Sequence, residues 1–140
     1  MADDAYVAMW ATTAMKPEAM QLLPAFGVQY KTSFYWMKDY GGRRMGMGAW
    51  NRSGVEELLI GRRGKAKAWK LQIPAWKIHP VLTHSRKPAW FRDIIWRGTQ
   101  HLADPRRVEL FARRRAKGWA ATGLELDGRD IRDVVQTWPT

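Results

Sequence analysis

The chain has 140 residues, with 24 lysines and arginines against 13 aspartates and glutamates, and its formal net charge is +11. A chain of this length has room for one domain, so we expect a single domain over residues 1–140. It has no cysteine, which excludes disulfides and thiolate metal sites, and the scattered His79, His84 and His101 lack metal-site spacing, so we expect no metal.

The N-terminal part of the chain predicts two strands with a helix between them. Residues 6–12 form a short apolar run with a tryptophan and a β-branched end, which is typical of a buried strand. Pro17 stands where a first helical turn tolerates proline, and Gly27 ends the helix that follows. Residues 28–38 are rich in aromatic and β-branched side chains, so they predict the second strand.

The central part of the chain predicts loops and short strands. Four glycines among residues 41–48 are too many for a regular element and predict a mobile loop. Residues 55–60 return to strand-like apolarity, and residues 72–74, with their proline, predict a short edge strand. We expect the basic stretch 62–70 between them to be a turn.

The C-terminal part predicts two helices and two strands. Apolar residues recur at helical spacing between Pro88 and Gly98, which predicts the best-defined helix of the chain. Residues 107–112 and 119–126 are strand-like, and residues 127–130 resemble a cap before a final helix. Strands that alternate with helices indicate an α/β fold with a mostly parallel sheet flanked by helices.

Two adjacent carboxylates, Glu56 and Glu57, fall within a predicted strand. Neighbouring side chains of a strand face opposite sides, so these two are not expected to work as a general acid and base. We expect one of them to be satisfied inside the protein and the other to be solvated.

Grouped basic residues indicate a polyanion-binding surface, with nucleic acid as the first expected partner. Acidic residues collect instead near the C-terminal end, and this asymmetry predicts one basic face. The residues assigned to that face are Arg43, Arg44, Arg62, Arg63, Lys65, Lys67, Arg113, Arg114 and Arg115.

The sequence predicts a cytoplasmic protein without a membrane partner. Asp3 and Asp4 stand where a signal peptide has basic residues. No apolar run approaches the roughly 18 residues that span a bilayer. Nine tryptophans give more large aromatic surface than one small core readily hides, which favours self-association or a protein partner.

Short motifs recur in family-like order and spacing between residue 3 and about residue 127. Together they resemble the MT-A70 family of adenine-N6 methyltransferases, the relatives of the mRNA adenosine methyltransferase catalytic subunit, with many phage and bacterial members. The resemblance implies an incomplete Rossmann-like methyltransferase fold in a permuted order. The motifs include Trp10-Ala11-Thr12, Trp36-Met37-Lys38, Gly46-Met47-Gly48, Trp50-Asn51-Arg52, Arg63-Gly64, His84-Ser85-Arg86-Lys87-Pro88 and Val108-Glu109-Leu110-Phe111-Ala112-Arg113.

The same resemblance implies a site for S-adenosylmethionine. Lys87 matches the lysine that meets the carboxylate of the cofactor, and Phe111 and Arg113 match residues that line its adenosine and ribose. Glu125 matches the last residue of a Gly-Asn-Glu motif, in which Leu124 replaces the asparagine and removes a polar partner.

The Asp-Pro-Pro-Trp motif that holds the target amine in this family is absent from the sequence. That motif places acceptors where positive charge develops on the amine, and losing even one preorganised contact of this type costs roughly 2.7 to 4 kcal/mol of barrier. We therefore expect no catalytic residues and no self-sufficient methyltransferase.

Three functions are consistent with these observations. The favoured one is a noncatalytic methyltransferase-like binding module, which self-associates or binds a protein partner and binds nucleic acid on its basic face, without a cofactor. The second is one part of a split adenine-N6 methyltransferase that still holds S-adenosylmethionine. The third is a small regulator or inhibitor encoded by a mobile element, which binds a host protein through its tryptophan-rich surface.

Overall fold

The computed structural model describes residues 2–45, 50–69, 71–82, 86–102 and 105–137. The chain divides into two compact units, residues 1–99 and residues 100–140, and the expected single domain stays a prediction. Across the described residues, no helix is both long and apolar enough to cross a membrane. Several predicted features lie outside the described residues, namely part of the glycine-rich loop (46–48), Lys70, His84, Ser85 and the last turn with Trp138.

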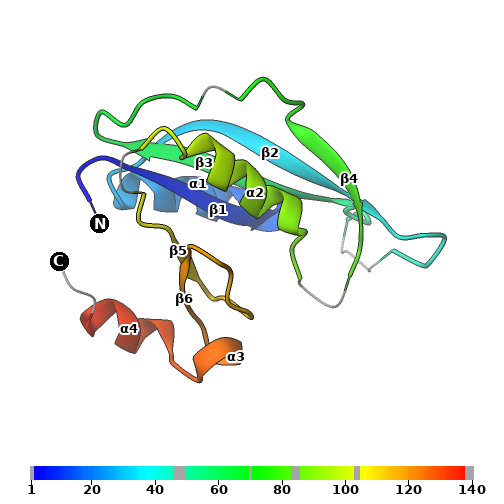
Figure 1. The fold of residues 1–140 in the computed structure, drawn as a ribbon. Helices are drawn as coiled ribbons and strands as arrows, with labels where there is room; N and C mark the ends of the chain where they lie inside the picture. The colour runs from blue at the N-terminus through cyan, green and yellow to red at the C-terminus, as the bar shows by residue number, and fades with distance from the viewer. Residues whose placement is uncertain (1, 46–49, 70, 83–85, 103–104, 138–140) are drawn as a thin grey trace. The chain divides into compact units, whose positions relative to one another are not determined.

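The first unit contains a four-stranded sheet with the order β1-β3-β2-β4 (Figure 1). The strands are β1 (Ala5–Thr12), β2 (Gln29–Asp39), β3 (Val55–Arg63) and β4 (Trp76–Pro80). Strands β1 and β2 both run antiparallel to β3, whereas β4 runs parallel to β2. The three longer strands confirm the predicted strands at these places, within a few residues at each end.

The expected α/β class is confirmed, but the expected mostly parallel sheet is wrong. Parallel neighbours need a crossover, usually a helix, between consecutive strands. Between β2 and β3 the described residues form turns and loop without a helix, and the chain returns antiparallel to the strand it has just left.

The predicted edge strand at residues 72–74 is also wrong, because pairing with β2 begins just after Pro74. The Tyr35 amide donates to the Ala75 carbonyl over 2.7 Å, and β4 starts at Trp76. Proline has no amide hydrogen to give to a ladder, which explains why the strand starts beyond it.

Helices cover the two faces of this sheet. Helix α1 (Lys16–Ala25) follows a short 3-10 turn, η1 (Thr13–Met15), and ends before Gly27, whose positive φ of 68° suits glycine. Helix α2 (Ala89–Gly98) begins after Pro88, as the sequence predicted. Figure 1 shows α1 and α2 on opposite sides of the sheet.

Side chains alternate between the two faces along each strand, and they contribute to two separate hydrophobic cores. Phe34, Leu58 and Ile60 pack with Phe91 and Ile94 of α2. On the other face, Leu59 packs with Ala11, Val28 and the α1 residues Ala19 and Leu23. Strand β3 is therefore buried on both faces, which is why it reads as a continuous apolar run from Leu58 to Ile60.

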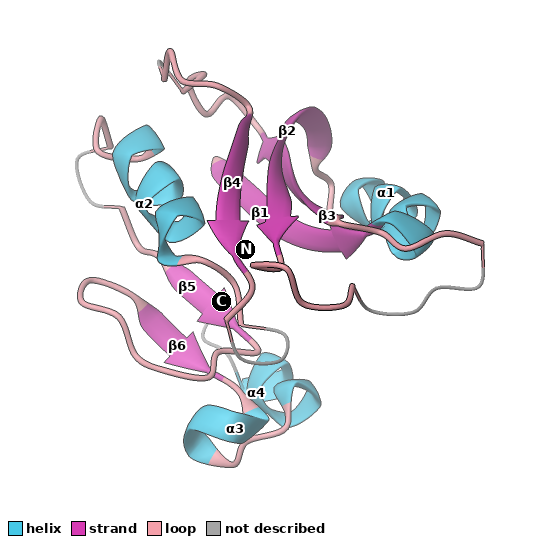
Figure 2. Ribbon diagram, turned by 90° about the vertical axis from the view of Figure 1, so that its right-hand side faces the viewer, coloured by secondary structure: helices cyan, strands magenta, loops and turns pink. Residues whose placement is uncertain are grey.

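The second unit is built on two short parallel strands, β5 (Val108–Leu110) and β6 (Ala120–Thr122). Two short helices follow, α3 (Leu124–Asp127) and α4 (Ile131–Thr137) (Figure 2). The strand predicted at residues 119–126 ends at Thr122, since the chain turns at Gly123 into α3. The predicted cap is confirmed, because the Asp130 carboxylate accepts the Arg132 amide over 2.8 Å.

Candidate functional site

The first candidate site is a charged cluster on the α2 face of the sheet. Glu56, on β3, is only 8% exposed and lies opposite Trp36 of β2 in the register of the sheet. Its two oxygens take different lysines: Lys38 Nζ lies 2.6 Å from Oε1, and Lys87 Nζ pairs with Oε2. The three residues come from two strands and from the segment just before α2.

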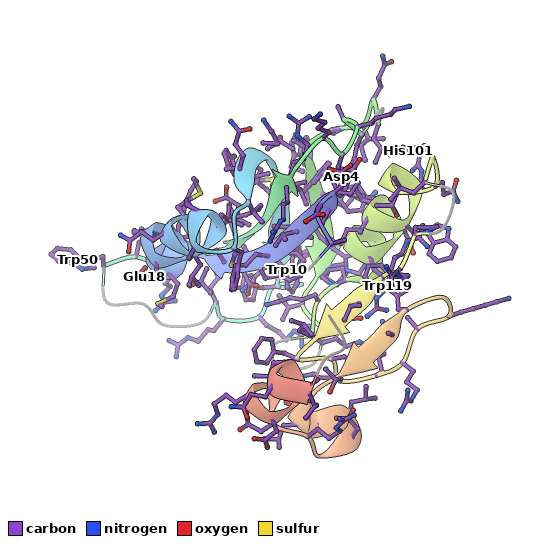
Figure 3. All side chains as sticks on the ribbon, turned by 90° about the vertical axis from the view of Figure 1, so that its left-hand side faces the viewer. Asp4, Trp10, Glu18, Trp50, His101 and Trp119 are labelled. Atoms are coloured by element: carbon purple, nitrogen blue, oxygen red, sulfur yellow. The ribbon has the colours of Figure 1, made fainter. Side chains whose placement is uncertain are left out.

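Aromatic rings surround the two ammonium groups. Lys87 Nζ lies 5.4 Å from the ring centroid of Trp10, on β1 (Figure 3), and 5.9 Å from that of Trp36. Lys38 Nζ lies 5.3 Å from the same Trp36 ring. Trp36 is fixed in turn, because its Nε1 donates to the His79 carbonyl over 2.8 Å. Ring faces attract cations, so the rings hold the ammonium groups without neutralising them.

The ion pairs keep Glu56 ionised. Burial alone would raise its pKa, but hydrogen bonds from Lys38 and Lys87 outweigh that effect and lower the pKa of this carboxyl below its ordinary value. Lys87 keeps 28% of its side chain exposed, so this residue lies partly open to solvent. An ammonium group is a charged donor that can bind a carboxylate.

The neighbouring carboxylate, Glu57, lies on the opposite face of the sheet. It is 7% exposed and pairs with Lys16 of α1, whose Nζ lies 2.9 Å from its Oε2. Burial raises its pKa, but hydrogen bonds from Ser33 and Lys16 overcome this and lower the pKa. The expectation of one solvated glutamate is therefore wrong: each carboxylate is buried, and each pairs with a lysine, Glu56 with Lys38 of β2 and Glu57 with Lys16 of α1.

The second unit brings together three residues predicted to contact the cofactor. Phe111 and Arg113 follow the carboxyl end of β5, and Glu125 follows the carboxyl end of the parallel strand β6. Arg113 Nη2 lies 2.7 Å from Glu125 Oε1. Ligands of α/β proteins often bind at the carboxyl ends of parallel strands. The role of these three residues toward a cofactor stays a prediction.

Phe111 has an unusual backbone conformation. Its φ of 57° is the one positive value among the non-glycine residues that the structure describes, and its side chain is 72% exposed. Non-glycine residues in this region carry strain and cluster at binding sites. Gly123 packs closely against the backbone of this turn, because a Cβ added at Gly123 would lie 2.4 Å from the Ala112 carbonyl oxygen.

The predicted basic face is divided among separate places. Arg62, Arg63, Lys65 and Lys67 lie at and after the C-terminal end of β3, beside the start of β2. Arg43 and Arg44 follow the far end of β2, roughly 33 Å of strand away at about 3.3 Å per residue.

These two groups therefore lie at opposite ends of the sheet and do not form one continuous cluster. The remaining three predicted residues, Arg113, Arg114 and Arg115, are exposed in the second unit. Among the residues that the structure describes, no three potential ligands gather into a metal site.

Sequence reasoning missed Lys38 and Glu56 as site residues. A signal for Lys38 was present in the sequence, because Trp36 and Lys38 are two apart on one strand and must share a face. What the sequence lacked was the pairing of β2 with β3, which sets Trp36 opposite Glu56. Lys87 pairs with Glu56, and its expected role toward the carboxylate of a cofactor stays a prediction.

Two comparisons with known proteins bear on these sites. The family model described as MT-A70 matches residues 1–138. The "Type II methyltransferase M.MunI" of Mycoplasma sp is 29% identical over 141 residues, covering 96% of this chain and 56% of the relative. The chain thus spans about half the length of that curated relative.

Proposed function

The chain belongs to the MT-A70 family, and on that premise we propose that it holds S-adenosylmethionine as the cofactor-binding part of a methyltransferase. The observation that carries this proposal is the partly exposed Lys87 side chain, whose ammonium group pairs with Glu56 beside the rings of Trp10 and Trp36. An ammonium in this setting suits the amino-acid carboxylate of the cofactor.

The second unit holds residues that the family resemblance assigns to a nucleoside, and we propose this role for them separately from that of Lys87. Phe111 offers an exposed ring for the adenine, and Arg113 and Glu125 offer charged groups for hydrogen bonds to the ribose. When bound, S-adenosylmethionine supplies an activated methyl group.

The methyl acceptor in this proposal is the exocyclic amine of an adenine, as in the family that the sequence resembles. No described residue is assigned to hold that amine, and the chain matches only part of its relative. We therefore propose that this chain binds the cofactor and that a second polypeptide segment binds the adenine.

A noncatalytic binding module is the second candidate. Leu124 favours it, because this side chain is 71% exposed at the position where the family has an asparagine amide. In this case the basic clusters bind nucleic acid or the protein binds a partner or itself, and no cofactor is needed. The exposed Trp50 and Trp76 offer surface for a protein partner. The same surface would serve a small regulator or inhibitor that binds a host protein.

Isothermal titration calorimetry with S-adenosylmethionine and S-adenosylhomocysteine separates the two candidates. The cofactor proposal expects a dissociation constant in the micromolar range, about −8 kcal/mol of binding free energy. An absence of binding at millimolar ligand would overturn it and leave the noncatalytic module. Lys16→Met is the matched control, because it removes a lysine paired with a buried glutamate on the opposite face of the sheet.

A further inference from the structure

Glu56 is shared between two lysines, and each lysine has its own carboxylate oxygen. Lys38 reaches Oε1 from the adjacent strand β2, and Lys87 reaches Oε2 from the segment before α2. The two lysines differ in access, since 18% of the Lys38 side chain is exposed against 28% for Lys87. Lys38 is thus the more enclosed partner of Glu56, and Lys87 is the outer one.

The charges joined by these ion pairs do not cancel. Two ammonium groups surround one carboxylate, which leaves a surplus of one positive charge in the cluster. Glu56 is buried, so this surplus is screened less than it would be in water. The Trp10 and Trp36 rings attract cations but carry no net charge, so these residues leave one positive charge unbalanced.

We infer that Lys38 is a specificity-determining residue for the carboxylate of the ligand, because its hold on Glu56 frees Lys87 to bind that carboxylate. The inference rests on the proposed function and adds a residue to it. With Lys38 present, Lys87 can turn to a ligand carboxylate while Glu56 remains paired. Without Lys38, Glu56 and Lys87 form a neutral pair, and a ligand must compete with Glu56 for the same ammonium.

On the opposite face of the sheet, Glu57 accepts a hydrogen bond from Ser33 and forms an ion pair with Lys16. This pair carries no surplus charge, although its carboxylate is as deeply buried as Glu56. Lys16→Met therefore provides a matched control for a lysine variant of the cluster.

The test compares two ligands that differ in the carboxylate. S-adenosylhomocysteine carries the amino-acid group, and methylthioadenosine keeps the nucleoside and the thioether but lacks the carboxylate. Lys38→Met is expected to weaken binding of S-adenosylhomocysteine about tenfold, the scale of one charged hydrogen bond, and to leave methylthioadenosine binding unchanged. Lys16→Met is expected to change neither.

Two further variants test the charge count itself. Glu56→Gln removes the competing carboxylate, so it is expected to bind S-adenosylhomocysteine at least as tightly as the wild type does. The double variant Lys38→Met with Glu56→Gln again has one surplus charge, and it is expected to recover the affinity lost in Lys38→Met. A purely structural role of Lys38 would not be rescued in this way.

The results distinguish this inference from the function on which it rests. Failure of the wild type to bind S-adenosylhomocysteine overturns the proposed function and the inference with it. Wild-type binding together with an unchanged Lys38→Met affinity, an equal loss for both ligands, or no recovery in the double variant overturns the inference alone. If Lys38→Met does not fold, Glu56→Gln still tests the inference. Weaker binding of S-adenosylhomocysteine by Glu56→Gln than by the wild type would overturn it.

Discussion

Glu56 and Glu57 are consecutive in the chain, yet their carboxylates lie on opposite faces of the same sheet and pair with different lysines. Glu56 takes Lys38 and Lys87 on the α2 face, and Glu57 takes Lys16 on the α1 face. Two consecutive residues of β3 thus place one buried carboxylate on each face of the sheet. This arrangement gives most of the predictions below a natural control on the other face.

Replacing Lys87 by methionine is expected to weaken S-adenosylhomocysteine binding by about 10- to 100-fold, because a charged hydrogen bond contributes about 1.5–3 kcal/mol. Glu56 keeps Lys38 as a partner in this variant, so no buried charge is left alone. Calorimetry measures the loss, and Lys16→Met should bind as the wild type does. Equal affinities for Lys87→Met and wild type would contradict the assignment of Lys87.

Acid is expected to destabilise the first unit through both glutamates. Each has a folded-state pKa below its ordinary value of 4.5, so their contribution is present above that value and is lost as pH falls through the folded pKa. Urea unfolding at neutral pH and at about pH 3 should therefore show a fall in the free energy of unfolding. The double variant Glu56→Gln with Glu57→Gln should lose less unfolding free energy between the two pH values. A loss equal to that of the wild type would mean that other groups cause the acid sensitivity.

Phe91 is expected to be a main support of the site from the side of α2. It is 2% exposed, and its ring lies 4.8 Å from that of Trp10 in an edge-on contact. Phe91→Ala should cost about 3–5 kcal/mol of unfolding free energy, because it removes a buried ring and leaves a cavity. Trp50→Ala is the control: this side chain is 99% exposed, and its loss should stay within about 0.5 kcal/mol in chemical denaturation.

Gly123→Ala is expected to disturb the turn that carries Phe111 in the second unit. The added Cβ would lie 2.4 Å from the Ala112 carbonyl oxygen and 2.6 Å from the Ala112 nitrogen, which are backbone atoms that no rotamer change can move. We expect a cost of about 1–3 kcal/mol, as for other overpacked sites.

Gly128→Ala is the comparison for that change. Gly128 also has a positive φ, of 70°, but an added Cβ there meets nothing within 4 Å. Its cost should be limited to the backbone conformation, about 1 kcal/mol. Chemical denaturation followed by a signal from the second unit should rank Gly123→Ala as the more damaging change, and the reverse order would contradict the close packing.

Nucleic-acid binding, if the basic clusters are used, should depend on salt. Lys65→Gln is expected to weaken binding to a labelled duplex and to reduce the slope of log K against log salt by about 0.9, the value for one phosphate contact. Arg132→Gln is the control, because Arg132 already pairs with Asp130. No binding at low salt, or a flat salt dependence, would remove the basic clusters as a nucleic-acid surface.

Local patterns predicted most of the elements. The apolar run at β3, the aromatic run at β2 and the helical spacing in α2 all report the face that each segment buries, and these segments form where the sequence placed them. The direction of the sheet was not predictable in this way. Alternating strands and helices suggested parallel neighbours, whereas β2 and β3 are joined without a helix in the described residues and pair antiparallel.

The sequence by itself determined the residue types of the site and the family to which the chain belongs, since both depend on the identity and order of residues along the chain. Only the tertiary structure decided that Lys38, Glu56 and Lys87 form one cluster, and that Glu57 does not belong to it. The physical reason is the strand itself. Its period of two fixes which residues share a face, but the neighbours on that face depend on strand order and register, which long-range backbone pairing sets.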